Sequence, residues 1–143
     1  MPLRRIVVAI DGSEPADRAL GLAAELARTS GGATLTLVSA ISDPITVAPT
    51  PVAGLELVLE AEQQGAERDL AQRAERLRGQ GLPVETVVQV GAAADVVAGV
   101  ADATAADLVV AGSTGKGAIE RALLGSVTTR LLHFLRRPLL VVP

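Results

Sequence analysis

Glycines, hydroxyl side chains and a lysine gather in residues 111–130, AGSTGKGAIERALLGSVTTR. Gly112 and Gly115 follow the apolar run DLVV, where glycine allows a sharp turn and brings backbone N–H groups close to an anion. Gly125 and Ser126 open a segment with helical spacing, and a helix N-terminus attracts negative charge. The stretch therefore predicts an anion site built from two sets of backbone donors. Side-chain donors are available from Ser113, Thr114, Lys116, Ser126 and Thr128.

Two common nucleotide motifs do not match this stretch. The phosphate loop G-x-x-x-x-G-K-[ST] requires glycine where Val110 stands and a hydroxyl residue where Gly117 stands. The dinucleotide fingerprint G-x-G-x-x-G, started at Gly115, requires glycine at Glu120. Lys116 is the only lysine of the chain, and its ammonium either contacts the anion or remains in solvent.

Composition and charge exclude several classes of function. The 143 residues suit one compact domain spanning 1–143, and a core of small aliphatic side chains follows from 49% apolar but only 1% aromatic residues. A net charge of −3 argues against a nucleic-acid partner. The absence of cysteine excludes disulfides and thiol chemistry, and the single histidine, His133, forms no histidine cluster and is expected to be structural.

The opening residues, MPLRRIVVAIDG, do not predict a secretory signal. Their apolar run is about five residues long before Asp11, whereas a signal needs roughly 7–15. No apolar stretch is long enough to span a bilayer. We expect a cytoplasmic protein with no membrane partner.

Alternating strand and helix patterns are expected to position the anion site. Short β-branched runs predict strands over 5–10, 33–41, 83–90, 107–111 and 138–143, and helical spacing predicts helices over 13–29, 55–78, 92–106 and 126–137. Ser13 is the expected N-cap of the first helix, and Arg136 and Arg137 the expected last turn of the final one. Residues 42–54, with three prolines, predict a long loop that serves as a connector or a lid. Parallel strands need such crossover helices, so the fold class is α/β with helices on both faces.

The segment GSTGKGAIERALLGSVT, with G-x2-G-x9-G-S spacing, resembles the nucleotide-binding signature of the universal stress protein family. The opening IVVAIDGS and the closing RPLLVVP resemble that family's first and last strands, so the resemblance covers essentially the whole chain. It implies a single doubly wound domain with a five-stranded parallel sheet in the order 3-2-1-4-5. Ligands in such sheets bind where the winding reverses, here between strands one and four.

The resemblance also implies ATP as the ligand and assigns residues to it. Gly112, Gly115, Gly125 and Ser126 match the family's phosphate and ribose positions, whereas Ala9, Asp11 and Ala40 match its adenine side. Ser113, Lys116, Val127 and Thr128 complete the expected cofactor-binding set, and Asp11 is the expected carboxylate for Mg²⁺. Thr114 stands where many members have His or Arg, so no catalytic residue is assigned.

Three functions remain open at this point. The first is a small ATP-binding regulatory module of the stress response. The second is an enzyme, at most a slow ATP hydrolase or a nucleotidyl-transfer enzyme, with Asp11 as its only carboxylate at the ligand edge. The third is an interaction protein that binds no nucleotide. In all three, the apolar last strand predicts a two-fold dimer through residues 139–142.

Overall fold

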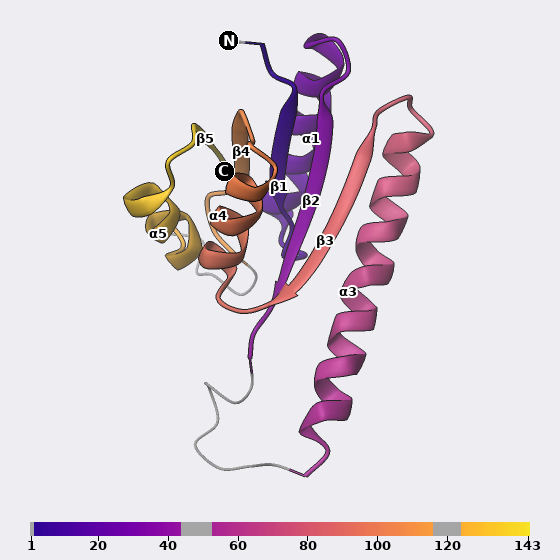
Figure 1. Cartoon of the computed structure of the whole chain (residues 1–143), viewed down its shortest axis with the longest axis vertical. Coiled ribbons are helices and arrows are strands. Elements are labelled where there is room, and N and C mark those ends of the chain that lie inside the picture. The colour runs from indigo at the N-terminus through magenta and orange to yellow at the C-terminus, as the bar shows by residue number, and fades with distance from the viewer. Residues whose placement is uncertain (1, 44–52, 116–123) are drawn as a thin grey trace.

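The computed structural model describes residues 2–43, 53–115 and 124–143. Within these described residues, five strands alternate with four helices (Figure 1). The strands are β1 (Arg5–Ala9), β2 (Thr34–Ile41), β3 (Val84–Val90), β4 (Leu108–Gly112) and β5 (Leu139–Val142). The helices are α1 (Glu14–Thr29), α3 (Leu55–Arg78), α4 (Ala93–Ala103) and α5 (Ser126–Phe134).

All strand pairs are parallel, and the sheet order is β3-β2-β1-β4-β5. This confirms the predicted α/β class and the strand order. The winding reverses between β1 and β4, because β2 lies on one side of β1 and β4 on the other. The carboxyl ends of β1 and β4 therefore form the sheet edge that a ligand would occupy.

Two apolar layers cover the two faces of the sheet. Alternate residues of β1 divide between them: Ile6 and Val8 pack with α1 and α3, whereas Val7 packs with α4 and α5. The central strands read as continuous apolar runs because both of their faces are buried. Alanines on α1, among them Ala19, Ala23 and Ala27, allow this helix to lie close to the sheet.

Most predicted boundaries agree with the structure to within a few residues, and α3 begins and ends where the sequence predicts. The last helix differs, since it ends at Phe134 and excludes Arg136 and Arg137. Pro138 disfavours helical backbone at the residue before it, and Leu135 is already extended. Arg137 instead donates hydrogen bonds to the Ala106 carbonyl and to Asp102, which ties the approach to β5 to the end of α4.

No helix among the described residues combines the length and the hydropathy that a bilayer crossing requires.

Candidate functional site

A hollow of about 110 Å³ lies at the carboxyl edge of the sheet, where β1 and β4 end. Its walls come from β1, β2, β4, α4 and the start of α5. Sites that enclose a drug-sized ligand measure roughly 300–1,000 Å³, so this hollow encloses only part of such a molecule. The lining residues are Ala9, Ile10, Asp11, Ala16, Val38, Ala40, Ala93, Val97, Ala111, Gly112, Thr114, Gly115, Gly125, Ser126, Val127 and Thr128.

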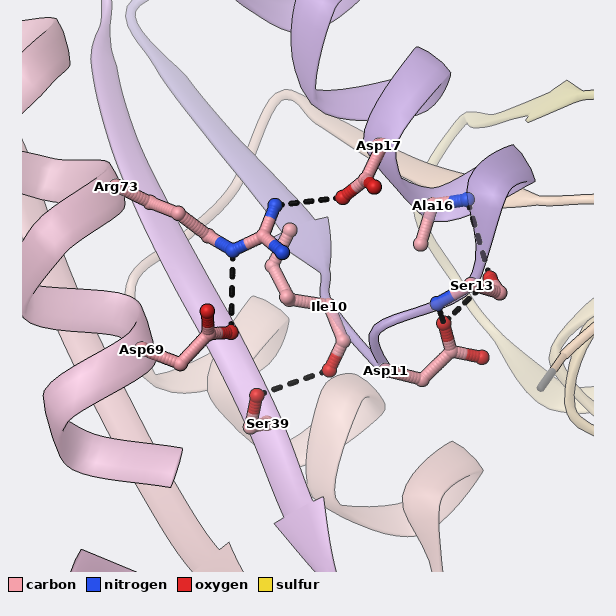
Figure 2. A network of polar contacts seen from close by, with 8 residues as sticks. All are labelled: Ile10, Asp11, Ser13, Ala16, Asp17, Ser39, Asp69 and Arg73. Carbon is pink, nitrogen blue, oxygen red and sulfur yellow. Dashed lines mark hydrogen bonds and ion pairs between the residues drawn. The ribbon is translucent and has the colours of Figure 1, made fainter. Parts of the chain in front are cut away.

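Asp11 is held in a defined orientation at the end of β1. Its Oδ1 accepts hydrogen bonds from the backbone N–H of Ser13 at 2.9 Å and from the Ser13 hydroxyl at 2.5 Å (Figure 2). The Ser13 Oγ also accepts from the Ala16 N–H, which caps α1 as predicted. The other carboxylate oxygen, Oδ2, lies toward Gly115. The turn between β1 and α1 therefore supplies a carboxylate in a defined orientation, and the Ala16 N–H at the start of α1 is already bonded within the protein.

Close packing accounts for glycine at residue 112, the last residue of β4, and at residue 125, the N-cap of α5. A Cβ on Gly112 would lie 2.8 Å from the Pro15 carbonyl carbon and from the Ala16 nitrogen, at the start of α1. A Cβ on Gly125 would lie 3.1 Å from the Thr114 Cα. The φ angles of Gly112 and Gly125 are not positive, so neither position requires glycine for a left-handed backbone. Glycine at both positions lets the end of β4 approach α1 and α5.

The N-terminus of α5 opens onto the same hollow. Gly125 is the N-cap residue, and no side chain among the described residues caps this helix. Ser126 and Val127 therefore present first-turn N–H groups beside the turn that follows β4. The first turn of α5 also contains no acidic residue. An anion at this end of the hollow meets favourable donors and a favourable helix dipole.

Thr128 joins α5 to β4. Its buried hydroxyl donates a 2.7 Å hydrogen bond to the Gly112 carbonyl. The sequence predicted Thr128 as a donor to the ligand, but in this structure its hydroxyl proton is used within the protein. Thr128 thus holds the helix N-terminus against the end of the strand.

The opposite wall of the hollow is apolar. Val38 and Ala40 come from β2, and Ala93 and Val97 come from α4. Val38, Ala93 and Val97 were not predicted as site residues. Val97 belongs to the helical pattern predicted over residues 92–106, but such a pattern does not distinguish a core residue from a pocket wall.

Nine of the expected cofactor-binding residues line the hollow. Ser113 does not line the hollow. Its backbone N–H donates a hydrogen bond to the Val142 carbonyl, and its carbonyl accepts one from the Gly125 N–H. Lys116 lies outside the described residues, as does most of the predicted 42–54 loop. The residues that do line it are Ala9, Asp11, Ala40, Gly112, Gly115, Gly125, Ser126, Val127 and Thr128.

The described residues form no cluster of three or more His, Cys, Asp or Glu side chains that would hold a metal alone. Mg²⁺ in nucleotide sites is commonly bound by one or two carboxylates together with phosphates and waters. A single carboxylate at Asp11 fits that donor set, with phosphate as the main ligand.

The match to known proteins extends over this whole arrangement. The model of the universal stress protein family matches residues 2–143. A universal stress protein of Mycolicibacterium smegmatis is 32% identical, with 96% of this chain and 47% of that protein covered. Universal stress protein MJ0531 of Methanocaldococcus jannaschii is 28% identical, with 97% and 81% covered. The chain thus spans about half the length of the first of these relatives.

Solved structures share the fold. The universal stress protein UspA of Lactobacillus plantarum superposes with a TM-score of 0.88 at 24% identity and covers 100% of this chain and 99% of its own. A universal stress protein in complex with cAMP gives a TM-score of 0.71 at 26% identity, covering 99% and 98%. The Archaeoglobus fulgidus protein in complex with dAMP gives 0.68 at 25%, covering 100% of both chains. With the family model matched from residue 2 to residue 143, this chain belongs to the universal stress protein family.

Proposed function

We propose that this protein is a regulatory module that binds an adenine nucleotide, ATP in the first instance, in the hollow between β1 and β4. The observation that carries the proposal is the uncapped N-terminus of α5, which opens onto the same hollow as the Gly112 to Gly115 turn. Both features direct backbone donors toward one anion. Related structures with bound cAMP and dAMP support an adenine nucleotide as the ligand.

The hollow has chemically different sides that match the parts of a nucleotide. Val38, Ala40 and Val97 offer apolar surface to a base, and the N–H groups of Ser126 and Val127 offer donors to phosphate. Since the hollow is small, the base and ribose would fill it and the phosphates would lie along its open glycine edge. Mg²⁺, if bound with ATP, would be held by the phosphates with Asp11 as protein ligand.

Mass spectrometry of the gently purified protein tests the ligand class directly. We expect copurifying ATP or another adenine nucleotide. A protein that carries none, and whose melting temperature is unchanged by added ATP, would support the interaction-protein alternative and contradict the proposal.

Asp11 at the ligand edge is the observation that keeps a catalytic function as the second candidate. We expect ATP turnover well below about 1 per second, compared with about 10 per second for a typical enzyme. Asp11 is the only ionisable side chain among the described residues that line the hollow, so it has no acid–base partner there. Asp11→Asn is the suitable control, because the asparagine oxygen can still accept both bonds from Ser13 while the charge is lost. Turnover of several per second that disappears in Asp11→Asn would instead establish an enzyme.

We also propose that β5 pairs with β5 of a second copy. β5 lies at the end of the sheet, and β4 is its only partner among the described strands. The Pro138 carbonyl accepts a hydrogen bond from the Val109 N–H of β4, and the Val142 carbonyl accepts one from the Ser113 N–H. Backbone groups alternate in direction along a strand, so Leu139 and Val141 direct their N–H and C=O groups to the open side of β5. An antiparallel pair related by a two-fold axis at Leu140 would satisfy these groups.

Val141→Pro is expected to separate copies that are joined through β5 and so to lower the mass measured by light scattering. The substitution removes a donor on the open side, so the bonds between β4 and β5 remain and ATP binding is retained. Leu140→Pro is the matched control, because it removes a donor directed at β4 and should lower the melting temperature. A wild-type protein that stays monomeric at high concentration would contradict the β5 pairing.

A further inference from the structure

The long helix α3 differs in charge and in burial between its two halves. Residues 55–66 contain three glutamates and no basic residue, whereas residues 67–78 contain four arginines and three acidic residues. Residues 55–66, all of which are described, include no buried residue, and Val58 is 55% exposed. Figure 1 shows this N-terminal half extending past the carboxyl ends of the strands. An acidic, partly apolar helix segment therefore projects from the body of the protein.

The other half of α3 forms a groove with α1. The groove measures about 570 Å³, and Leu20, Gly21, Ala24 and Leu77 contribute its apolar lining. Arg28 and Arg76 also line it, and neither forms an ion pair with a carboxylate of the described residues. The groove thus combines an apolar floor with two unneutralised arginines.

Arg73 fixes the geometry of this groove. Its guanidinium lies 2.6 Å from Asp17 of α1 and 3.1 Å from Asp69 of α3 (Figure 2). Partial burial acts to lower the pKa of Arg73, but the hydrogen bond that Arg73 donates to Asp17 and the negative charge of Asp69 outweigh it and raise the pKa above its usual value. Arg73 stays charged and joins the two helices, so its charge is not available to an incoming group.

One stripe of α3 runs from the projecting half into the groove. The stripe consists of Val58, Glu62, Gly65, Asp69 and Arg76. Successive members are four, three, four and seven residues apart, and these spacings place all five on one side of a helix. Glycine inside a helix is destabilising relative to alanine. A Cβ on Gly65, or on Gly21 of α1, would meet no described heavy atom within 4 Å. Packing within one protomer therefore does not account for either glycine.

We propose that the groove between α1 and α3 binds the projecting half of α3 from a second copy of this chain, with the two α3 helices antiparallel. Such a pair is two-fold symmetric, so each copy inserts its acidic half into the basic groove of the other. Gly65 then faces Asp69 of the partner subunit, Glu62 faces Gln72 of the partner subunit, and Val58 faces Arg76 of the partner subunit. The pair of Gly65 and Asp69 lies nearest the axis, where the missing side chain of Gly65 allows the helices to approach closely.

Charge complementarity favours α3 of a second copy as the segment that binds in this groove. Glu62 has no ion pair among the described residues, and the antiparallel register places it four residues, about one helical turn, from Arg76 of the partner subunit. Asp69 of the partner subunit lies three residues away, but its charge is neutralised by the ion pair with Arg73. This surface is also separate from the β5 edge, because α3 packs on β3 and β2 at the other end of the sheet. The two contacts can therefore be tested independently, and neither depends on nucleotide binding.

Disulfide trapping between full-length variants tests the register, since the wild-type chain has no cysteine. We expect an oxidised mixture of Val58→Cys and Arg76→Cys to form a mixed dimer. Each variant alone should form no disulfide-linked dimer. Its two thiols would lie about 27 Å apart along the antiparallel pair, at 1.5 Å per residue. A disulfide needs Cα atoms within about 7 Å of each other. Glu60→Cys mixed with Arg76→Cys is the control, since residue 60 lies on the other side of the helix.

A charge swap supplies the second measurement. Arg76→Glu should raise the dissociation constant of the α3 contact about tenfold, because two symmetric attractions become repulsions, and Glu62→Arg should do the same. The double variant Glu62→Arg/Arg76→Glu should recover most of the wild-type affinity. Sedimentation in the Val141→Pro background isolates this contact from β5. Failure of the mixed pair to cross-link above the Glu60→Cys control, or no recovery in the double variant, overturns the proposal.

Discussion

Gly115→Val is expected to abolish the increase in melting temperature that we expect ATP to give the wild-type protein. A ligand that binds only the folded state stabilises it by about 2.7 kcal/mol at a hundredfold excess over Kd. Valine at residue 115 would place a branched side chain between Asp11 and the turn after β4, where the proposed phosphates approach the backbone. Thermal melts with and without ATP measure the loss.

The same variant should leave the protein without ATP nearly as stable as the wild type. The φ of Gly115 is not in the left-handed region, so valine introduces no backbone strain. The nearest atom to an added Cβ is the Asp11 Oδ2, at 3.1 Å, and it belongs to a side chain that can move. Gly115→Ala serves as the graded control and should retain part of the ATP effect. If Gly115→Val gained as much stability from ATP as the wild type, the proposed position of the phosphates would be wrong.

Gly112→Ala is expected to have the opposite profile and to destabilise the fold itself. The added Cβ would lie 2.8 Å from backbone atoms of Pro15 and Ala16, which belong to a capped helix start and cannot move independently. Overpacking of this kind costs about 1–3 kcal/mol, which lowers Tm by roughly 3–10 °C for a protein of this size. Calorimetry or a thermal melt without ligand measures it.

Gly99→Ala is the matched control for Gly112→Ala. Gly99 lies exposed within α4, and an added Cβ there would meet no described atom within 4 Å. Alanine should therefore leave Tm unchanged or raise it, since the helix gains up to about 1 kcal/mol. An equal Tm for Gly112→Ala and the wild type would show that β4 and α1 are not in tight contact.

Features that depend on nearby residues were predictable from the sequence. The Ser13 cap, the limits of α3 and the apolar strands each follow from a hydroxyl, a periodicity or a β-branched run within a few positions. The alternation of these elements also predicted the parallel sheet. The family resemblance then supplied the strand order, and with it the edge where β1 and β4 end.

Contacts between distant segments could not be predicted in this way. The hydrogen bond from Arg137 to the Ala106 carbonyl is one example, and the bond from the Thr128 hydroxyl to the Gly112 carbonyl is another, because each partner is specified only when the elements are packed together. The apolar wall of the hollow likewise needs Val97 of α4 to meet Val38 of β2, across nearly sixty positions of the chain.

Patterns within the sequence were thus enough to predict the elements of this protein, their order along the chain and the glycine positions of the candidate site. The packed fold was needed to explain those glycines, since Gly112 is explained by its close approach to Pro15. The packed fold also shows that α3 projects beyond the sheet and forms a groove with α1. The physical reason is that periodicity and capping are set by neighbours in the chain, whereas close approach and burial are set by which elements pack together.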